Sequence, residues 1–100
     1  MSYGSDDWYQ SKVCEGIQRG EDLRFAATAV VDEAIKVGSA KASQAGEIAM
    51  NWADRADGHF SHAATLRPSR DRDAENVLLN GEGALKRGFE ALADATRLIS

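Results

Sequence analysis

A run of apolar and small residues, spaced three or four positions apart, extends from Asp22 to Asp57. It consists of Leu23, Ala27, Val30, Val31, Ala34, Gly38, Ala42, Ala45, Ala49, Trp52, Ala53 and Ala56. This spacing places every member on one face of an α-helix, which completes a turn about every 3.6 residues. Because the run stays in phase across Gly38, it favours one long helix over residues 22–57. A break near Gly38 is the alternative, since Gly followed by Ser can also end one helix and start the next.

Two further segments with helical patterns flank this run. The first covers about residues 7–19, follows a loose lead at residues 1–5 and ends at Gly20, a residue type that commonly terminates helices. The last covers about residues 71–98 and also keeps its apolar residues in one phase. The sequence therefore predicts a single all-α domain over residues 1–100. It has three helical segments, a long central helix and an antiparallel helical hairpin.

Glycine is frequent within the last helical pattern, where it occupies positions 81, 83 and 88. Each Gly in a helix interior costs about 1 kcal/mol relative to Ala, so close packing is expected to offset the penalty. Gly58 is expected to close the central helix, which centres the hairpin connection near residue 64. In this register small residues of the two helices lie level with each other: Ala42, Ala45 and Gly46 opposite Gly81, Gly83 and Lys86.

The apolar content of 43% overstates the core that this chain can build. Seventeen of the 43 apolar residues are Ala, so helices can approach closely but each contact buries little apolar area. We expect a partner to supply the missing burial, either a second copy of the chain or another protein. One hypothesis is a homodimer in which the Ala and Gly stripes pack against their own copies.

The formal net charge of -4, from 12 basic and 16 acidic residues, argues against direct binding to nucleic acid. It is compatible with docking on a basic protein surface. The chain contains no apolar run of about 18 residues, which argues against a membrane partner. It has a single cysteine, Cys14, and no basic segment followed by an apolar one at its start. These features predict a cytoplasmic location.

Few residues offer catalytic or metal-binding chemistry. His59 and His62 could approach one metal ion together with Asp57, but Gly58 is expected to break the helix between the carboxylate and the imidazoles. Cys14 lies within a predicted helix beside apolar residues, so we expect it at the edge of the core. The sequence has no nucleophile elbow, phosphate-binding glycine loop or zinc-protease motif. We therefore expect no enzyme activity, no cofactor and no metal.

Acidic residues are concentrated in the first 38 positions, which contain seven acidic and four basic residues. Such a region attracts a basic partner, including a protein that normally holds DNA or RNA. Aromatic residues occur in the same region, and exposed aromatic side chains often anchor protein interfaces. The candidate protein-binding residues are Asp6, Asp7, Trp8, Tyr9, Arg24 and Phe25.

The leading hypothesis is an inhibitor or adaptor that occupies a partner's subunit-binding or nucleic-acid-binding surface. Small size, negative charge and the lack of catalytic motifs are typical of inhibitor proteins from phages and bacteria, anti-CRISPR proteins among them. This is an analogy of class and rests on no shared motif. The alternatives are a structural homodimer or assembly subunit, and a helical bundle that binds a metal or ligand through His59 and His62.

Overall fold

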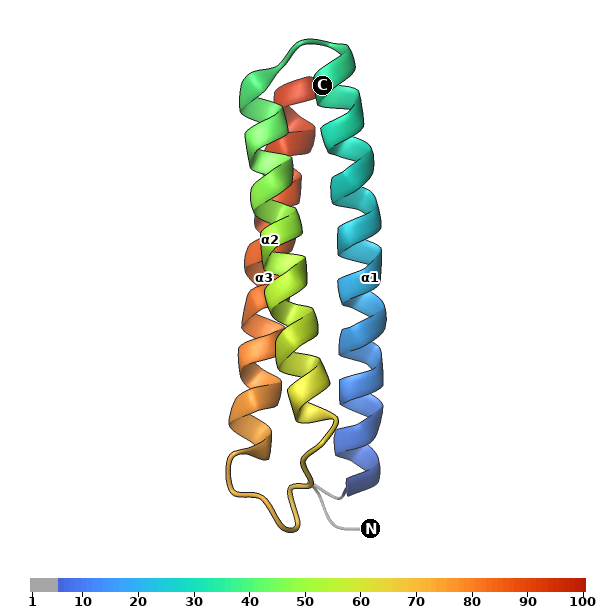
Figure 1. The fold of residues 1–100 in the computed structure, drawn as a ribbon, viewed down its shortest axis with the longest axis vertical. Coiled ribbons are helices and arrows are strands. Elements are labelled where there is room, and N and C mark those ends of the chain that lie inside the picture. Colours follow the sequence, from blue (N-terminus) through green and yellow to red (C-terminus); the bar gives the residue numbers. More distant parts are fainter. Residues whose placement is uncertain (1–5) are drawn as a thin grey trace.

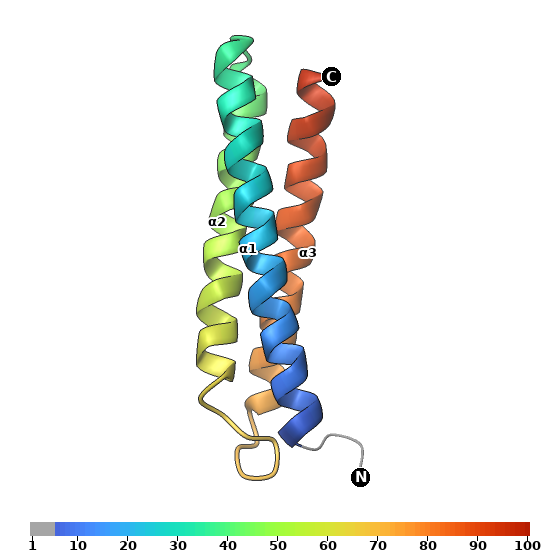
Figure 2. The same cartoon turned by 90° about the vertical axis from the view of Figure 1, so that its right-hand side faces the viewer.

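A computed structural model describes residues 6–100, and this part of the chain forms three α-helices without a strand (Figure 1). Helix α1 spans Asp6–Lys36, α2 spans Ala40–Ala63 and α3 spans Ala74–Ile99. The helices lie side by side along a body of 52 × 19 × 16 Å (Figures 1 and 2). The predicted all-α class with three helical segments is confirmed, as is the antiparallel hairpin of α2 and α3. The predicted lead at residues 1–5 lies outside the described residues.

The chain reverses direction at Gly38, where the continuous helix favoured by the sequence pattern is interrupted. Gly38 has a φ of 73°, a left-handed conformation that strains any residue with a Cβ. The Ser39 N–H donates to the Ala34 carbonyl at 2.9 Å, and the Ser39 hydroxyl accepts from the Ala42 N–H at 3.2 Å. The prediction of one helix over 22–57 is therefore wrong, and the alternative of a break near Gly38 is correct. The apolar pattern continues across the break because its residues in α1 and its residues in α2 both face the core of the bundle.

The predicted helix stop at Gly20 is also wrong, because α1 continues through this residue to Lys36. Gly20 is buried, and a Cβ added there would meet only Leu85, at 4.0 Å. Gly16 and Leu23, which precede and follow it on the same helix face, are also buried, so packing of this face stabilises the helical backbone at Gly20. A glycine ends a helix when it adopts a left-handed conformation, and among the described residues only Gly38 does so.

Helix α2 passes through Gly58, and this shifts the register of the α2–α3 hairpin. Gly58 is exposed and keeps a helical backbone, since among the described glycines only Gly38 has a positive φ. The additional turn ends at Ala63 and brings Phe60 level with Gly81. The predicted pairing of Ala42, Ala45 and Gly46 with Gly81, Gly83 and Lys86 is therefore wrong. A Cβ at Gly46 would instead lie 2.6 Å from Cγ2 of Val31 in α1.

Phe60 occupies the position where all three helices meet. Its ring is fully buried and lies between Gly16 of α1 and Gly81 of α3. A Cβ at Gly81 would lie 2.8 Å from Cζ of the ring, and a Cβ at Gly16 would clash with the same ring. Packing thus offsets the glycine penalty at Gly81. It also does so at Gly88, where a Cβ would clash with Leu23, whereas Gly83 has open space around it.

We expect Gly16→Ala to lower the free energy of unfolding by about 1–3 kcal/mol, because the added methyl group overpacks a ring that has Gly81 on its other side. Gly83→Ala is the matched control. It should raise the free energy of unfolding by about 0.5–1 kcal/mol, because Ala fits the helix better and meets no neighbour. Urea denaturation followed by circular dichroism measures both values. Equal stability of the two variants would contradict the packing described for Phe60.

Candidate protein-binding surface

Tyr9, predicted to belong to a protein-binding surface, is fully buried in the structure. Its hydroxyl donates to the carbonyl of Ala63 at 2.8 Å and lies 3.2 Å from the carbonyl of Ala74. It therefore ties α1 to both ends of the α2–α3 connection. Burial, and secondarily the negative charge of Asp71, raises the pKa of the Tyr9 hydroxyl above its ordinary value of 10.0. Tyr9 is consequently unavailable to a partner in this conformation.

The residues around Tyr9 are also engaged within the chain. Trp8 is partly buried and packs against the core. The Asp6 carboxylate accepts hydrogen bonds from the backbone N–H of Ser69 at 3.3 Å and from its hydroxyl at 2.9 Å. Only Asp7 is exposed in this part of the candidate set. The start of α1 therefore fastens the α2–α3 connection to the bundle and does not present an exposed aromatic face.

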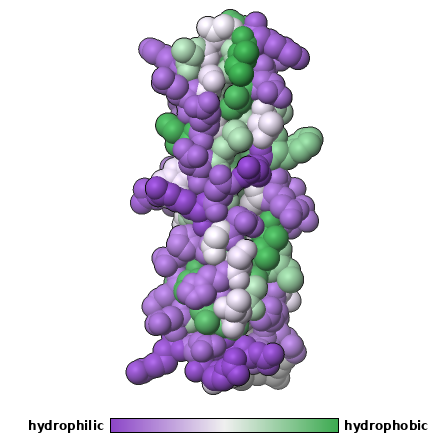
Figure 3. All heavy atoms as spheres, in the orientation of Figure 1, coloured by the Kyte–Doolittle hydropathy of each residue, from purple (hydrophilic) through white to green (hydrophobic). Residues whose placement is uncertain are grey.

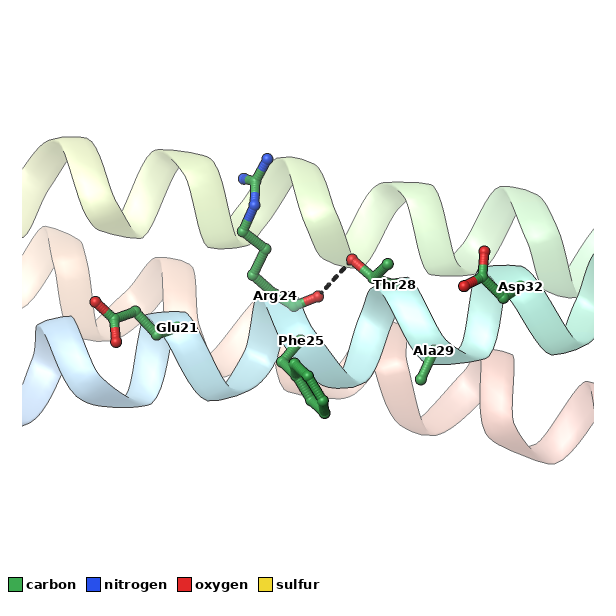
Figure 4. Close-up of a pocket in the computed structure, with 6 residues that line it drawn as sticks. All are labelled: Glu21, Arg24, Phe25, Thr28, Ala29 and Asp32. Carbon is green, nitrogen blue, oxygen red and sulfur yellow. Dashed lines mark hydrogen bonds between the residues drawn. The ribbon is translucent and has the colours of Figure 1, made fainter.

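The other two candidates, Arg24 and Phe25, lie together on the outer surface of α1. The Phe25 side chain is 81% exposed, the largest exposed fraction among the large hydrophobic residues of the described chain. It lines a shallow, open surface hollow of about 460 Å³ that runs along α1. Figure 4 shows Arg24 directed towards α2 and the Phe25 ring pointing away from it. The residues that line this Phe25 surface are Glu21, Arg24, Phe25, Thr28, Ala29 and Asp32.

The charges around Phe25 are unevenly compensated. Arg24 forms an ion pair with Asp54 of α2, and both side chains are more than half exposed. An exposed pair of this kind contributes about 0–1 kcal/mol, but it orients the guanidinium towards α2. Within residues 6–100, neither Glu21 nor Asp32 has a basic side chain within ion-pair distance. The hollow therefore combines an exposed aromatic ring with two unpaired carboxylates, one at each end.

Of the six lining residues, only Arg24 and Phe25 were candidates from the sequence. Glu21 and Asp32 belong to its acidic first 38 positions, and Thr28 and Ala29 were not identified. A signal was present, since Glu21, Phe25, Thr28 and Asp32 are spaced four, three and four positions apart and so share one helix face. Phe25, Thr28 and Asp32 already lie within the predicted helix over residues 22–57, and Glu21 joins their face because α1 is continuous through Gly20. The Thr28 hydroxyl donates to the Arg24 carbonyl at 2.9 Å, so its polar atom is satisfied within the helix (Figure 4).

The remaining exposed large hydrophobic residues lie on all three helices and in the turn between α1 and α2. The view in Figure 3 is largely hydrophilic, and its apolar side chains form separate groups. Besides Phe25, the exposed large hydrophobic residues are Ile35, Val37, Ile48, Leu79 and Leu98. None of these five lines the hollow around Phe25.

The other residues considered for chemistry do not form a cluster. Within the described residues, no group of three or more His, Cys, Asp or Glu side chains could hold a metal ion. His59 and His62 lie on the last turns of α2, because the helix does not end at Gly58 as predicted. Cys14 is exposed, so its predicted place at the edge of the core is wrong. It lies on the side of α1 that faces away from Val13 and Gly16, which are buried.

Comparison with known proteins finds no matching family model, no matching curated protein and no matching solved structure. In residues 6–100, no helix combines the length and the apolar character that crossing a membrane requires.

We expect Tyr9→Phe to lower the free energy of unfolding by about 1 kcal/mol at neutral pH, because it removes the hydroxyl that bonds to Ala63 and Ala74. The difference between the two proteins should shrink as the pH rises above about 10. The reason is that the unfolded state loses the Tyr9 proton first, since folding raises the pKa of this hydroxyl. Urea denaturation at pH 7 to 11 measures this difference, and a constant difference over the whole range would contradict the assignment.

Proposed function

We propose that this protein binds another protein through the Phe25 surface of α1 and acts as an inhibitor or adaptor. It would do so by occupying a site that a subunit or a nucleic acid otherwise fills. The observation that carries the proposal is the 81% exposure of Phe25 within a hollow lined by apolar and acidic residues. We infer no catalytic role, because the six lining residues include no nucleophile paired with an adjacent base and no cluster of three metal-ligating side chains.

Burial of Phe25 by a partner supplies a favourable contribution to binding. A fully buried Phe side chain gains about 1.5–3 kcal/mol relative to an exposed one. Aromatic residues at the centre of an interface commonly carry much of the binding energy. Phe25 lies between Glu21 and Asp32 along the helix, so polar groups surround an apolar centre. This arrangement of an anchor with a polar rim matches the general anatomy of protein interfaces.

The charges of the Phe25 surface favour a partner with basic side chains around an apolar cleft. Glu21 and Asp32 lack ion-pair partners among the described residues, so Lys or Arg side chains can approach both. Proteins that hold nucleic acid present basic surfaces of this kind. The formal charge of -4 on the whole chain favours the same association and disfavours direct binding to nucleic acid.

The homodimer hypothesis receives less support from the packing. It relied on small-residue stripes, yet Gly16 and Gly81 already accommodate Phe60, and Gly46 accommodates Val31. A two-fold dimer through Phe25 would also bring the unpaired carboxylates of two identical helices together, and like charges that meet in an interface weaken it. We therefore propose a different protein as the partner and treat self-association as a competing outcome of the experiment.

We expect Phe25→Ser to abolish partner binding without lowering the free energy of unfolding by more than about 0.5 kcal/mol, since the side chain is exposed. Ile48→Ser is the control, because Ile48 is an exposed apolar residue of α2 that does not line the Phe25 surface. A photo-crosslinking amino acid at position 25 or 48, used in a nuclease-treated bacterial lysate, identifies what contacts each site.

The proposal predicts one protein crosslinked in stoichiometric amounts from position 25 and absent from position 48. Its complex with the unlabelled chain should form with the wild type and with Ile48→Ser, but not with Phe25→Ser. Equal crosslinking from both positions, or crosslinking only to a second copy of the chain, would contradict it. Light scattering of the purified chain, with a monomer mass of 10.8 kDa, shows independently whether the chain associates with a second copy.

A further inference from the structure

A second hollow, of about 460 Å³, lies between α2 and α3. Its polar lining comes from Arg55 and His59 of α2 and from Asn80 and Arg87 of α3, and Trp52 lies between the two helices. No acidic residue lines it. A chain with an overall formal charge of -4 therefore contains a hollow whose only fully charged lining groups are two guanidinium ions. We call it the Trp52 hollow.

Both guanidinium groups are held against the same indole ring. The Arg55 Cζ lies 4.7 Å from the centroid of the Trp52 ring, and the Arg87 Cζ lies 5.3 Å from it. Contacts of this length are attractive, with about 0.5–1 kcal/mol each at exposed sites. Both arginines also line the Trp52 hollow, so a ligand within it lies beside both guanidinium groups.

The two arginines have no acidic partner in the described part of the chain. None of its ion pairs involves Arg55 or Arg87. This distinguishes them from Arg24, whose guanidinium is neutralised by Asp54. Because an unpaired Arg presents five N–H donors in a planar fork, each of the two can bind a phosphate or carboxylate through two parallel hydrogen bonds.

Nearby acidic side chains face other surfaces of the bundle. Asp54 and Asp57 of α2 line a hollow towards α1. Glu82 and Glu90 of α3 line another one, which also contains Arg19 of α1. The positions of these four carboxylates leave the Trp52 hollow as a separate positive site. A long polyanion would extend beyond it towards the acidic surfaces, so the geometry favours a compact ligand.

We propose that the Trp52 hollow binds a small ligand that carries a phosphate group. Arg55 and Arg87 bind the phosphate oxygens, and the Asn80 amide and the His59 imidazole supply further donors. Gly83 leaves the hollow open, because a Cβ there would meet nothing within 4 Å, and the exposed Leu79 offers an apolar wall for an organic portion. This site is independent of the Phe25 surface, which lies on α1.

Isothermal titration calorimetry of the full chain with inorganic phosphate, AMP and adenosine tests the proposal. We expect saturable binding of AMP with one site per chain and no binding of adenosine. Arg55→Gln and Arg87→Gln should each weaken AMP binding about tenfold, because each removes one charged fork. The matched control is Arg19→Gln, which should leave the affinity unchanged. The Arg19 Cζ lies 5.3 Å from the centroid of the Phe89 ring, on another surface of the bundle.

The ligands also separate the sources of the phosphate group. Tighter binding of AMP than of inorganic phosphate assigns the hollow to phosphate esters, and equal binding assigns it to free phosphate. The proposal is overturned if neither ligand saturates the wild type, or if Arg19→Gln weakens binding as much as Arg55→Gln does. It is also overturned if a single-stranded oligonucleotide binds the hollow more tightly than AMP, since the site then serves a nucleic acid. Circular dichroism establishes that each variant is folded.

Discussion

The contact of the Phe60 ring with Gly16 and Gly81 determines how the three helices fit together. The ring is fully buried, and both positions that face it lack a side chain. It contributes a large apolar area to a thin core in which many of the buried residues are Ala, and only Tyr9 is larger among the fully buried side chains. Because a Cβ on either side would meet the ring, a slip of α1 or α3 by one residue is disfavoured. The register of the bundle thus depends on this contact.

The arrangement around Phe60 also explains which surfaces stay open. The inner face of α1 is used for packing from Val13 through Gly16 to Ala27, and the outer face has no helix to cover it. Phe25 lies on that outer face. At the start of α1, by contrast, Tyr9 and Asp6 bind the connection between α2 and α3. One continuous helix therefore fastens the bundle at its beginning and presents an exposed aromatic residue, Phe25, further along its length.

The apolar periodicity predicted the helical class and the inward stripes, because spacing alone determines which residues share a helix face. It could not separate glycines that end helices from glycines that accommodate a neighbour. Gly38 has a positive φ, whereas Gly20 and Gly58 remain helical, and the three look alike in the sequence. The candidate surface was located only in part for the same reason. Tyr9 and Phe25 are both aromatic residues in the acidic first part of the chain, and only the tertiary contacts of the bundle bury one and expose the other.

A double-mutant cycle between Gly16 and Phe60 tests the role of this contact most directly. The free energy of unfolding is measured for the wild type, Gly16→Ala, Phe60→Leu and the double variant. Our account predicts that Gly16→Ala destabilises the wild type but is neutral or stabilising in the Phe60→Leu background, because the smaller side chain leaves room for the methyl group. A strictly additive cycle, in which Gly16→Ala costs the same in both backgrounds, would contradict the claim that the Phe60 ring sets the packing of the three helices.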